Sequence, residues 1–120
     1  MSQSSLQGVV VLDISRVLAG PFAAQILGDH GAEVIKIESF YGDDTRGYGP
    51  PFVEEDAPYY VGLNRNKKDI ALDLSTDEGR DILFRMLGEA DVLIENFKLS
   101  TWQKWGIDSP SALARQYPRL

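Results

Sequence analysis

The side chains best suited to binding chemistry follow apolar runs of the 120-residue chain. Arg16 comes shortly after residues 9–14, and Asn96, Phe97 and Lys98 follow a later apolar run. Arginine and lysine bind phosphate or carboxylate groups, and Phe97 offers a flat apolar surface beside the charge of Lys98. Each also has a structural interpretation, in which Arg16 pairs with a surface acid and Asn96 completes a turn. Both segments follow expected strands, and ligands of open α/β sheets bind outside the carboxyl ends of the strands.

Other candidates for chemistry have simpler explanations. By count alone, Asp43, Asp44, Glu54 and Glu55 suggest a paired-carboxylate site, but a solvated loop accounts for them. His30, the single histidine, falls at the expected end of a helix, where its charge complements the helix dipole. The chain has no cysteine, which excludes disulfides, thiolate metal sites and a cysteine nucleophile. We therefore expect no metal site in this chain.

A strand, a helix and a second strand must position the first of these side chains. Residues 9–14 predict a strand, Pro21 is typical of the first position of a helix, and Gly31 is the expected left-handed end of that helix. Residues 34–37 predict the second strand. The apolar side of the helix is expected to carry Ala23, Ile26 and Leu27. Such a unit has parallel strands and a right-handed crossover, and ligands bind outside the carboxyl ends of its strands.

A second unit repeats this logic after a long irregular segment. Residues 39–58 combine glycine, proline, acids and aromatics, which favours a flap over the sheet edge. The capping box of Ser75 and Glu78 predicts the start of a further helix. The remaining expected elements are a helical turn at 59–63, a basic turn at 64–68, strands at 70–74 and 91–95, and short helices from residues 101 and 109. The predicted fold is α/β, a partial Rossmann-like parallel sheet with flanking helices.

Composition narrows the choice of ligand. The net charge of −6 argues against nucleic acid, which needs a basic face. The chain shows no signal peptide and no apolar run near the roughly 20 residues that cross a membrane, so we expect no membrane association and a cytoplasmic location. The first strand–helix turn, residues 15–21, has one glycine and lacks the dinucleotide fingerprint, which argues against NAD and FAD. The start of the helix could still attract a phosphate or carboxylate.

Six motifs run along the chain in a fixed order. They are VLDISRVLAGP at 11–21, GAEVIKIE at 31–38, GDDTRG at 42–47, NRNKK at 64–68, IALDL at 70–74 and ADVLIENF at 90–97. In order and spacing they resemble the class III CoA-transferases, the family of formyl-CoA and carnitine CoA-transferases, over essentially the whole chain. The α-methylacyl-CoA racemases share the fold and most of these motifs, but the asparagine of the E-N-F motif is more usual among the transferases.

The resemblance implies that residues 1–120 form the N-terminal part of a larger CoA-binding domain, truncated here. Coenzyme A or acyl-CoA would bind as a substrate, not as a permanent cofactor, in the crevice at the strand ends. The residues so implied are Arg16, Leu18, Ala19, Leu72, Asp73, Leu74, Ser75, Asn96, Phe97, Lys98 and Lys104. Leu18 stands where formyl-CoA transferases carry glutamine, which argues against formyl or oxalyl substrates.

Structural interpretations compete with several of these assignments. Residues 72–74 read as a buried strand, so contact with CoA would run through their backbone. Lys104 lies on an expected helix surface and could simply be solvated, as could the basic run at 65–68. Trp102 and Trp105 fit packing anchors better than stacking platforms.

The reaction that the resemblance implies moves CoA between an acyl-CoA and a carboxylic acid. An aspartate attacks the thioester to give a mixed anhydride and free CoA thiolate. The thiolate then attacks the aspartyl carbonyl of the anhydride, which releases the donor's carboxylate and leaves an aspartyl-CoA thioester that an incoming carboxylate resolves. In family members that aspartate lies beyond the position of Leu120, so we expect this chain alone to be inactive. The full-length family forms an interlocked homodimer. Alternatives are a racemase-like isomerase, which abstracts a proton, and a non-catalytic CoA-binding fragment.

Overall fold

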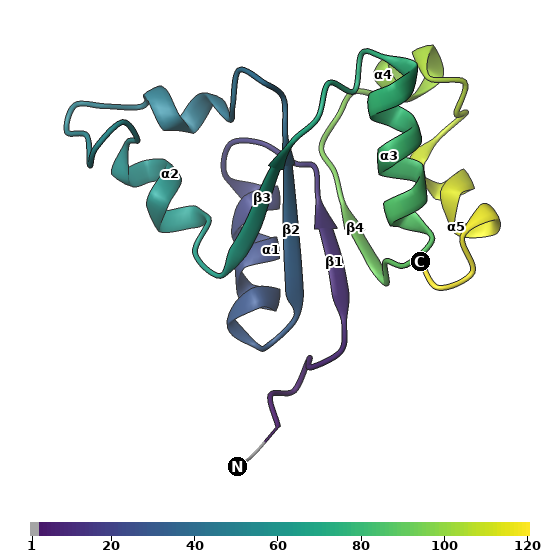
Figure 1. The fold of residues 1–120 in the computed structure, drawn as a ribbon, viewed down its shortest axis with the longest axis horizontal. Coiled ribbons are helices and arrows are strands. Elements are labelled where there is room, and N and C mark those ends of the chain that lie inside the picture. Colours follow the sequence, from purple (N-terminus) through teal and green to yellow (C-terminus); the bar gives the residue numbers. More distant parts are fainter. Residues whose placement is uncertain (1–2) are drawn as a thin grey trace.

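Four parallel strands form a sheet in the computed structural model, which describes residues 3–120 (Figure 1). Their order across the sheet is β3-β2-β1-β4. The strands are β1 (Val10–Asp13), β2 (Glu33–Glu38), β3 (Lys67–Ala71) and β4 (Val92–Ile94). Because neighbouring strands all pair in parallel, their carboxyl ends meet at one edge of the sheet. The expected α/β fold with a Rossmann-like parallel sheet is confirmed.

Helices lie on both faces of this sheet. They are α1 (Ala19–Asp29), η1 (Asp44–Gly47), α2 (Pro58–Leu63), α3 (Asp77–Leu87), α4 (Leu99–Lys104), η2 (Pro110–Ala112) and α5 (Leu113–Gln116), where η marks a 3-10 helix. Helix α1 packs on one face, and α3, α4 and α5 lie on the other (Figure 1). The segment that contains η1 and α2 extends beyond β3, away from β4 (Figure 1).

Helix α1 buries a different side from the one expected. It begins two residues before Pro21, and its buried residues are Pro21, Ala24 and Gln25. Of the three residues expected on the buried side, Ala23 and Ile26 are exposed and Leu27 is half-buried. Ala24 packs against valines of β1 and β2. A small side chain lets the helix approach the sheet closely, so packing density and not apolar size selected this side.

The larger core lies between the other face of the sheet and the C-terminal helices. Its most buried side chains include Leu12, Leu83, Leu87, Trp102 and Leu113. Leu83 and Leu87 of α3 and Leu113 of α5 therefore face this core. Trp102 has no exposed surface, which confirms its expected role in packing, whereas Trp105 is half-buried at the edge of this core.

The turn between β3 and α3 also differs from the prediction. Strand β3 begins and ends three residues earlier than the predicted 70–74, because Lys67 and Lys68, expected in a turn, pair with β2. The chain therefore leaves the sheet early, and Thr76 caps α3 by accepting a 3.1 Å hydrogen bond from the Gly79 amide. Ser75, the predicted cap, instead donates to the carboxylate of Asp73 through its amide and hydroxyl.

A glycine allows the start of α3 to lie directly against this turn. A Cβ atom at Gly79 would sit 1.9 Å from the carbonyl oxygen of Asp73, a backbone atom that cannot move aside alone. Gly79→Ala should therefore lower the free energy of unfolding by about 2 kcal/mol, measured by urea denaturation. Gly62→Ala in α2 is the matched control, since no atom lies within 4 Å of the added methyl group. That variant should gain up to about 1 kcal/mol from helix propensity. Equal stability of Gly79→Ala and wild type would contradict the packing described.

Candidate functional site

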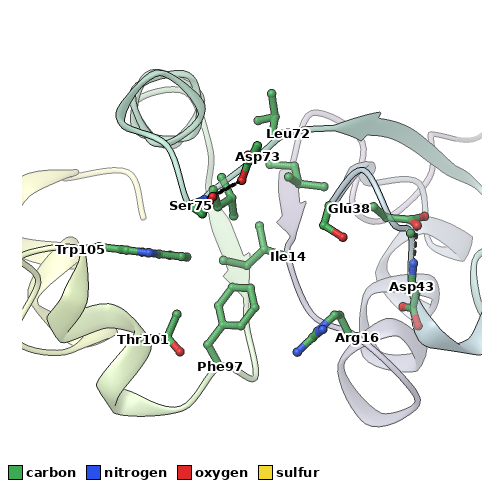
Figure 2. A pocket seen from close by; sticks show the side chains of 14 residues that line it. Ile14, Arg16, Glu38, Asp43, Leu72, Asp73, Ser75, Phe97, Thr101 and Trp105 are labelled. Carbon is green, nitrogen blue, oxygen red and sulfur yellow. Dashed lines mark hydrogen bonds between the residues drawn. The ribbon is translucent and has the colours of Figure 1, made fainter.

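A cavity of about 350 Å³ opens outside the carboxyl ends of the strands (Figure 2). Strand β1 connects through α1 to β2, its neighbour on one side. Its neighbour on the other side is β4, which the chain reaches through α3 on the opposite face of the sheet. Chain connections thus diverge at β1 and β4, and open α/β sheets bind ligands at such a point. Residues that follow all four strands line this cavity.

Six of the eleven sequence-predicted residues line the cavity. They are Arg16, Leu72, Asp73, Leu74, Ser75 and Phe97. The other five, which do not line it, are Leu18, Ala19, Asn96, Lys98 and Lys104. Asn96 nonetheless lies beside the site, because its side chain is hydrogen-bonded to the backbone of Arg16. The structure thus brings together the loops that follow β1, β3 and β4.

Sequence reasoning missed eight residues of the cavity wall. They are Ile14, Ile37, Glu38, Ser39, Gly42, Asp43, Thr101 and Trp105. The topology rule had pointed to the loops after Ile14 and Ile37, so their position at the ends of β1 and β2 was a usable signal. No such signal pointed to Trp105, because a tryptophan in a short helix is expected to be an ordinary packing residue.

Aromatic side chains from the β4–α4 segment build one wall (Figure 2). The ring of Phe97 meets those of Trp102 and Trp105 edge to face, with centroids 6.2 and 5.7 Å apart. One carboxylate oxygen of Glu95 accepts hydrogen bonds from the Phe97 amide and the Trp102 indole, both at 3.0 Å. This carboxylate fixes Phe97 relative to the buried tryptophan. The wall is therefore apolar and pre-formed.

Two buried ion pairs support the opposite, polar wall. Lys36 of β2 pairs with Asp43 at 3.0 Å, and Lys67 of β3 pairs with Asp13 at 2.8 Å, with all four side chains at most 1% exposed. The Lys36 ammonium also donates to the carbonyl of Ser15 at 3.2 Å. Burial alone would raise the pKa of Asp43, but hydrogen bonds from Thr45 and Lys36 hold it below its usual value. For Lys67 burial prevails over its partner Asp13, and its pKa is lowered.

Arg46 of η1 ties the irregular segment 39–58 to the sheet. Its guanidinium contacts Glu38, Asp56 and Asp69 at 2.7 to 2.8 Å and lies 3.8 Å from the centre of the Tyr60 ring. The Tyr60 hydroxyl donates to Glu38 at 2.7 Å. This segment, expected as a flap, is therefore held by an ion-pair network to the end of β2 and to the middle of β3. Through Glu38, Ser39, Gly42 and Asp43 it also contributes to the cavity wall.

Two of the three carboxylates that contact Arg46, those of Glu38 and Asp69, respond oppositely to their surroundings. Burial disfavours ionisation of Glu38, but hydrogen bonds from Arg46 and Tyr60 outweigh it and lower its pKa from 4.5 to about 2. Burial and the neighbouring Glu38 charge raise the pKa of Asp69 from 3.8 to about 6. Glu38 is therefore the ionised member of the pair, and Asp69 is the one that holds a proton in mildly acidic solution.

Comparison with known proteins identifies the family. Residues 6–120 match CoA-transferase family III. The chain belongs to this family. A succinate–glutarate CoA-transferase from Agrobacterium fabrum is 49% identical over 113 residues, and a human succinyl-CoA:glutarate CoA-transferase is 52% identical over 93 residues. These matches cover 88% and 77% of this chain but 28% and 21% of the relatives, so the chain spans about a quarter of their length.

Solved structures agree with this assignment. A CAIB/BAIF family protein from Brucella suis superposes with a TM-score of 0.86 at 48% identity, over 94% of this chain and 31% of that one. A hypothetical protein from Mycobacterium tuberculosis superposes with a TM-score of 0.85 at 38% identity, over 98% of this chain and 32% of that one. The family III resemblance expected from the motifs is confirmed.

The cavity of this family III chain is better suited to binding than to acid–base chemistry. Each carboxylate that lines it is already held: Glu38 by Arg46, Asp43 by Lys36, and Asp73 by Ser75. Hydrogen bonds from Ser75 also keep the pKa of Asp73 below its usual value. Within residues 3–120, no cluster of acids and histidine has the geometry of a metal site, and no helix is long and apolar enough to cross a membrane.

The Asp69 carboxyl should make folding pH-dependent. Because its pKa is about 6 in the folded protein and near 3.8 when unfolded, its ionisation between pH 4 and 6 weakens the folded state. Glu38 acts in the opposite direction: its contribution is present above pH 4.5 and is lost as the pH falls toward 2. Asp69→Asn should therefore raise the melting temperature at pH 7 by a few degrees and flatten its dependence on pH between 4 and 6.

Thermal unfolding from pH 4 to pH 7 measures this effect, with Asp29→Asn as the matched control. The hydrogen bond from Arg65 lowers the pKa of Asp29, so removing that charge should reduce stability at pH 7. The same change of side chain thus has opposite expected signs at the two positions. An unchanged pH dependence in Asp69→Asn would show that this carboxyl is not strained by its neighbours.

Proposed function

We propose that this chain forms part of the CoA-binding crevice of an enzyme that moves CoA between an acyl-CoA and a carboxylic acid. The observation that carries the proposal is the position of the cavity, at the strand ends between an apolar aromatic wall and a polar one. Membership of family III supports the reaction class. The relatives described above are named CoA-transferases for succinate, succinyl-CoA and glutarate, so we propose dicarboxylic acids as the substrate class.

In this proposal the two walls receive different parts of CoA. The adenine, a flat ring, lies against Phe97 and Trp105, and backbone groups of residues 72–75 border it. Arg16, whose side chain extends at the mouth of the cavity opposite Phe97, binds a phosphate (Figure 2). A cavity of about 350 Å³ is at the small end of ligand sites, so the rest of CoA runs over the neighbouring surface. There the exposed Lys98 and Lys104 offer further charges to phosphates.

The covalent exchange proposed for the whole protein proceeds through an aspartyl-CoA thioester. Such a carboxylate must be free to attack a thioester. The carboxylates of this cavity are hydrogen-bonded within the chain, which favours a nucleophile supplied from other residues. The part assigned to residues 1–120 is binding and orientation of CoA.

Titration with CoA at two salt concentrations tests the binding role. Arg16→Ala and Lys104→Ala should each weaken CoA about five- to tenfold at low salt, the value of an exposed charge–phosphate contact, and less at high salt. Phe97→Leu keeps the apolar volume and removes the ring, so it should weaken binding roughly tenfold at either salt concentration. Arg85→Ala, at the other end of α3, is the control for lost charge. Equal affinities for wild type and all variants would leave these positions with a purely structural role.

The chain should bind CoA without transferring it. Mixed with succinyl-CoA and glutarate, it should form no glutaryl-CoA above a protein-free control, because each carboxylate that lines its cavity is hydrogen-bonded within the chain. Mass spectrometry of the thioesters measures the product. Turnover that depends on the chain would overturn the assignment of a binding role alone.

A further inference from the structure

The segment that carries Arg16 has a backbone conformation that needs support. Val17, the next residue, has a φ of 74°, in the left-handed region that branched side chains rarely adopt. Arg16 lies outside any helix or strand, since β1 ends at Asp13 and α1 begins at Ala19. Contacts from elsewhere in the fold must therefore hold this segment in place.

The side chain of Asn96 supplies one of these contacts. The last backbone hydrogen bond between the β1 and β4 segments runs from the Ile14 amide to the Ile94 carbonyl at 3.0 Å. Two residues further along both segments, the Asn96 carboxamide takes over the pairing. Its nitrogen donates to the Arg16 carbonyl at 2.8 Å, and its oxygen accepts from the Arg16 amide at 3.1 Å. A carboxamide has the donor and acceptor of a peptide group, so it extends the ladder by one unit.

Contacts on the far side of the segment complete the support. Lys36 donates to the Ser15 carbonyl at 3.2 Å, and the Val17 amide faces both carboxylate oxygens of Asp43 at 3.4 Å. Arg16 thus lies between a buried ion pair and Asn96. Both hydrogen bonds of the exposed Asn96 carboxamide are directed at this segment.

We infer that Asn96 is a positioning residue that acts on CoA through Arg16. The inference rests on the proposed function and deepens it. Without the carboxamide, the backbone of Arg16 loses both hydrogen bonds on the β4 side. The Arg16 side chain is then no longer held in one position beside the cavity. Phosphate binding by Arg16 then weakens even though no charge has been removed.

A double-mutant cycle on the 120-residue chain tests this coupling. Asn96→Ala should weaken CoA three- to tenfold, and it should also reduce the salt dependence of binding, as Arg16→Ala does. The double variant should bind no more weakly than Arg16→Ala alone. Ser100→Ala, a small change at an exposed site nearby, should alter neither quantity. Asn96→Asp keeps the acceptor but places an oxygen against the Arg16 carbonyl, so it should fail in the same way.

The outcomes separate the inference from the proposed function. Additive losses in the double variant, or an unchanged salt dependence in Asn96→Ala, would mean that Asn96 does not act through Arg16, and would overturn the inference while CoA binding stands. Loss of affinity with Phe97→Leu but not with Arg16→Ala would also overturn it, because Arg16 would then have no ligand to position. An absence of CoA binding by the wild-type chain would reject both proposals. Urea denaturation of each variant tests whether a loss of CoA affinity comes from unfolding.

Discussion

Two buried ion pairs, Lys36–Asp43 and Lys67–Asp13, constrain the sheet beside the cavity. Removing these charges from water costs several kcal/mol for each ion, and only close, fully hydrogen-bonded partners offset that cost. Among the residues that the structure describes, no buried side-chain nitrogen or oxygen lacks a partner. The pairs join β1, β2, β3 and the loop after β2, so these segments have little freedom to shift relative to one another.

The constraint extends from the ion pairs to the cavity. The amide of Asp43 donates to Glu38, which binds Arg46, and Arg46 reaches carboxylates on β3 and on the long irregular segment. Charged groups therefore hold one wall of the cavity. The other wall depends on aromatic packing around Trp102. The cavity therefore lies between a wall fixed by ion pairs and an apolar aromatic wall, and Arg16 is the cationic side chain of its lining.

Much of this architecture could be predicted from local sequence. Apolar runs separated by helix signals predicted four strands, their parallel direction and the edge at which ligands bind. The errors occurred where packing overrides local preference. Ser75 has the spacing of a capping box, but the early end of β3 moved the cap to Thr76. Ala23 and Ile26 are the apolar choice for the buried side of α1, but close approach to the sheet favoured Ala24.

The sequence alone determined the family, through motifs whose order and spacing are independent of any contact between them. It also determined the α/β class, because hydrophobic periodicity is a local property of the chain. Only the tertiary structure decided which side chains serve the site. Asn96 and Arg16 are 80 residues apart, and Lys67 and Asp13 are 54 apart. Their contacts depend on strand register and on the exact ends of strands. These are set by the packing of the whole sheet, so no local pattern of residues specifies them.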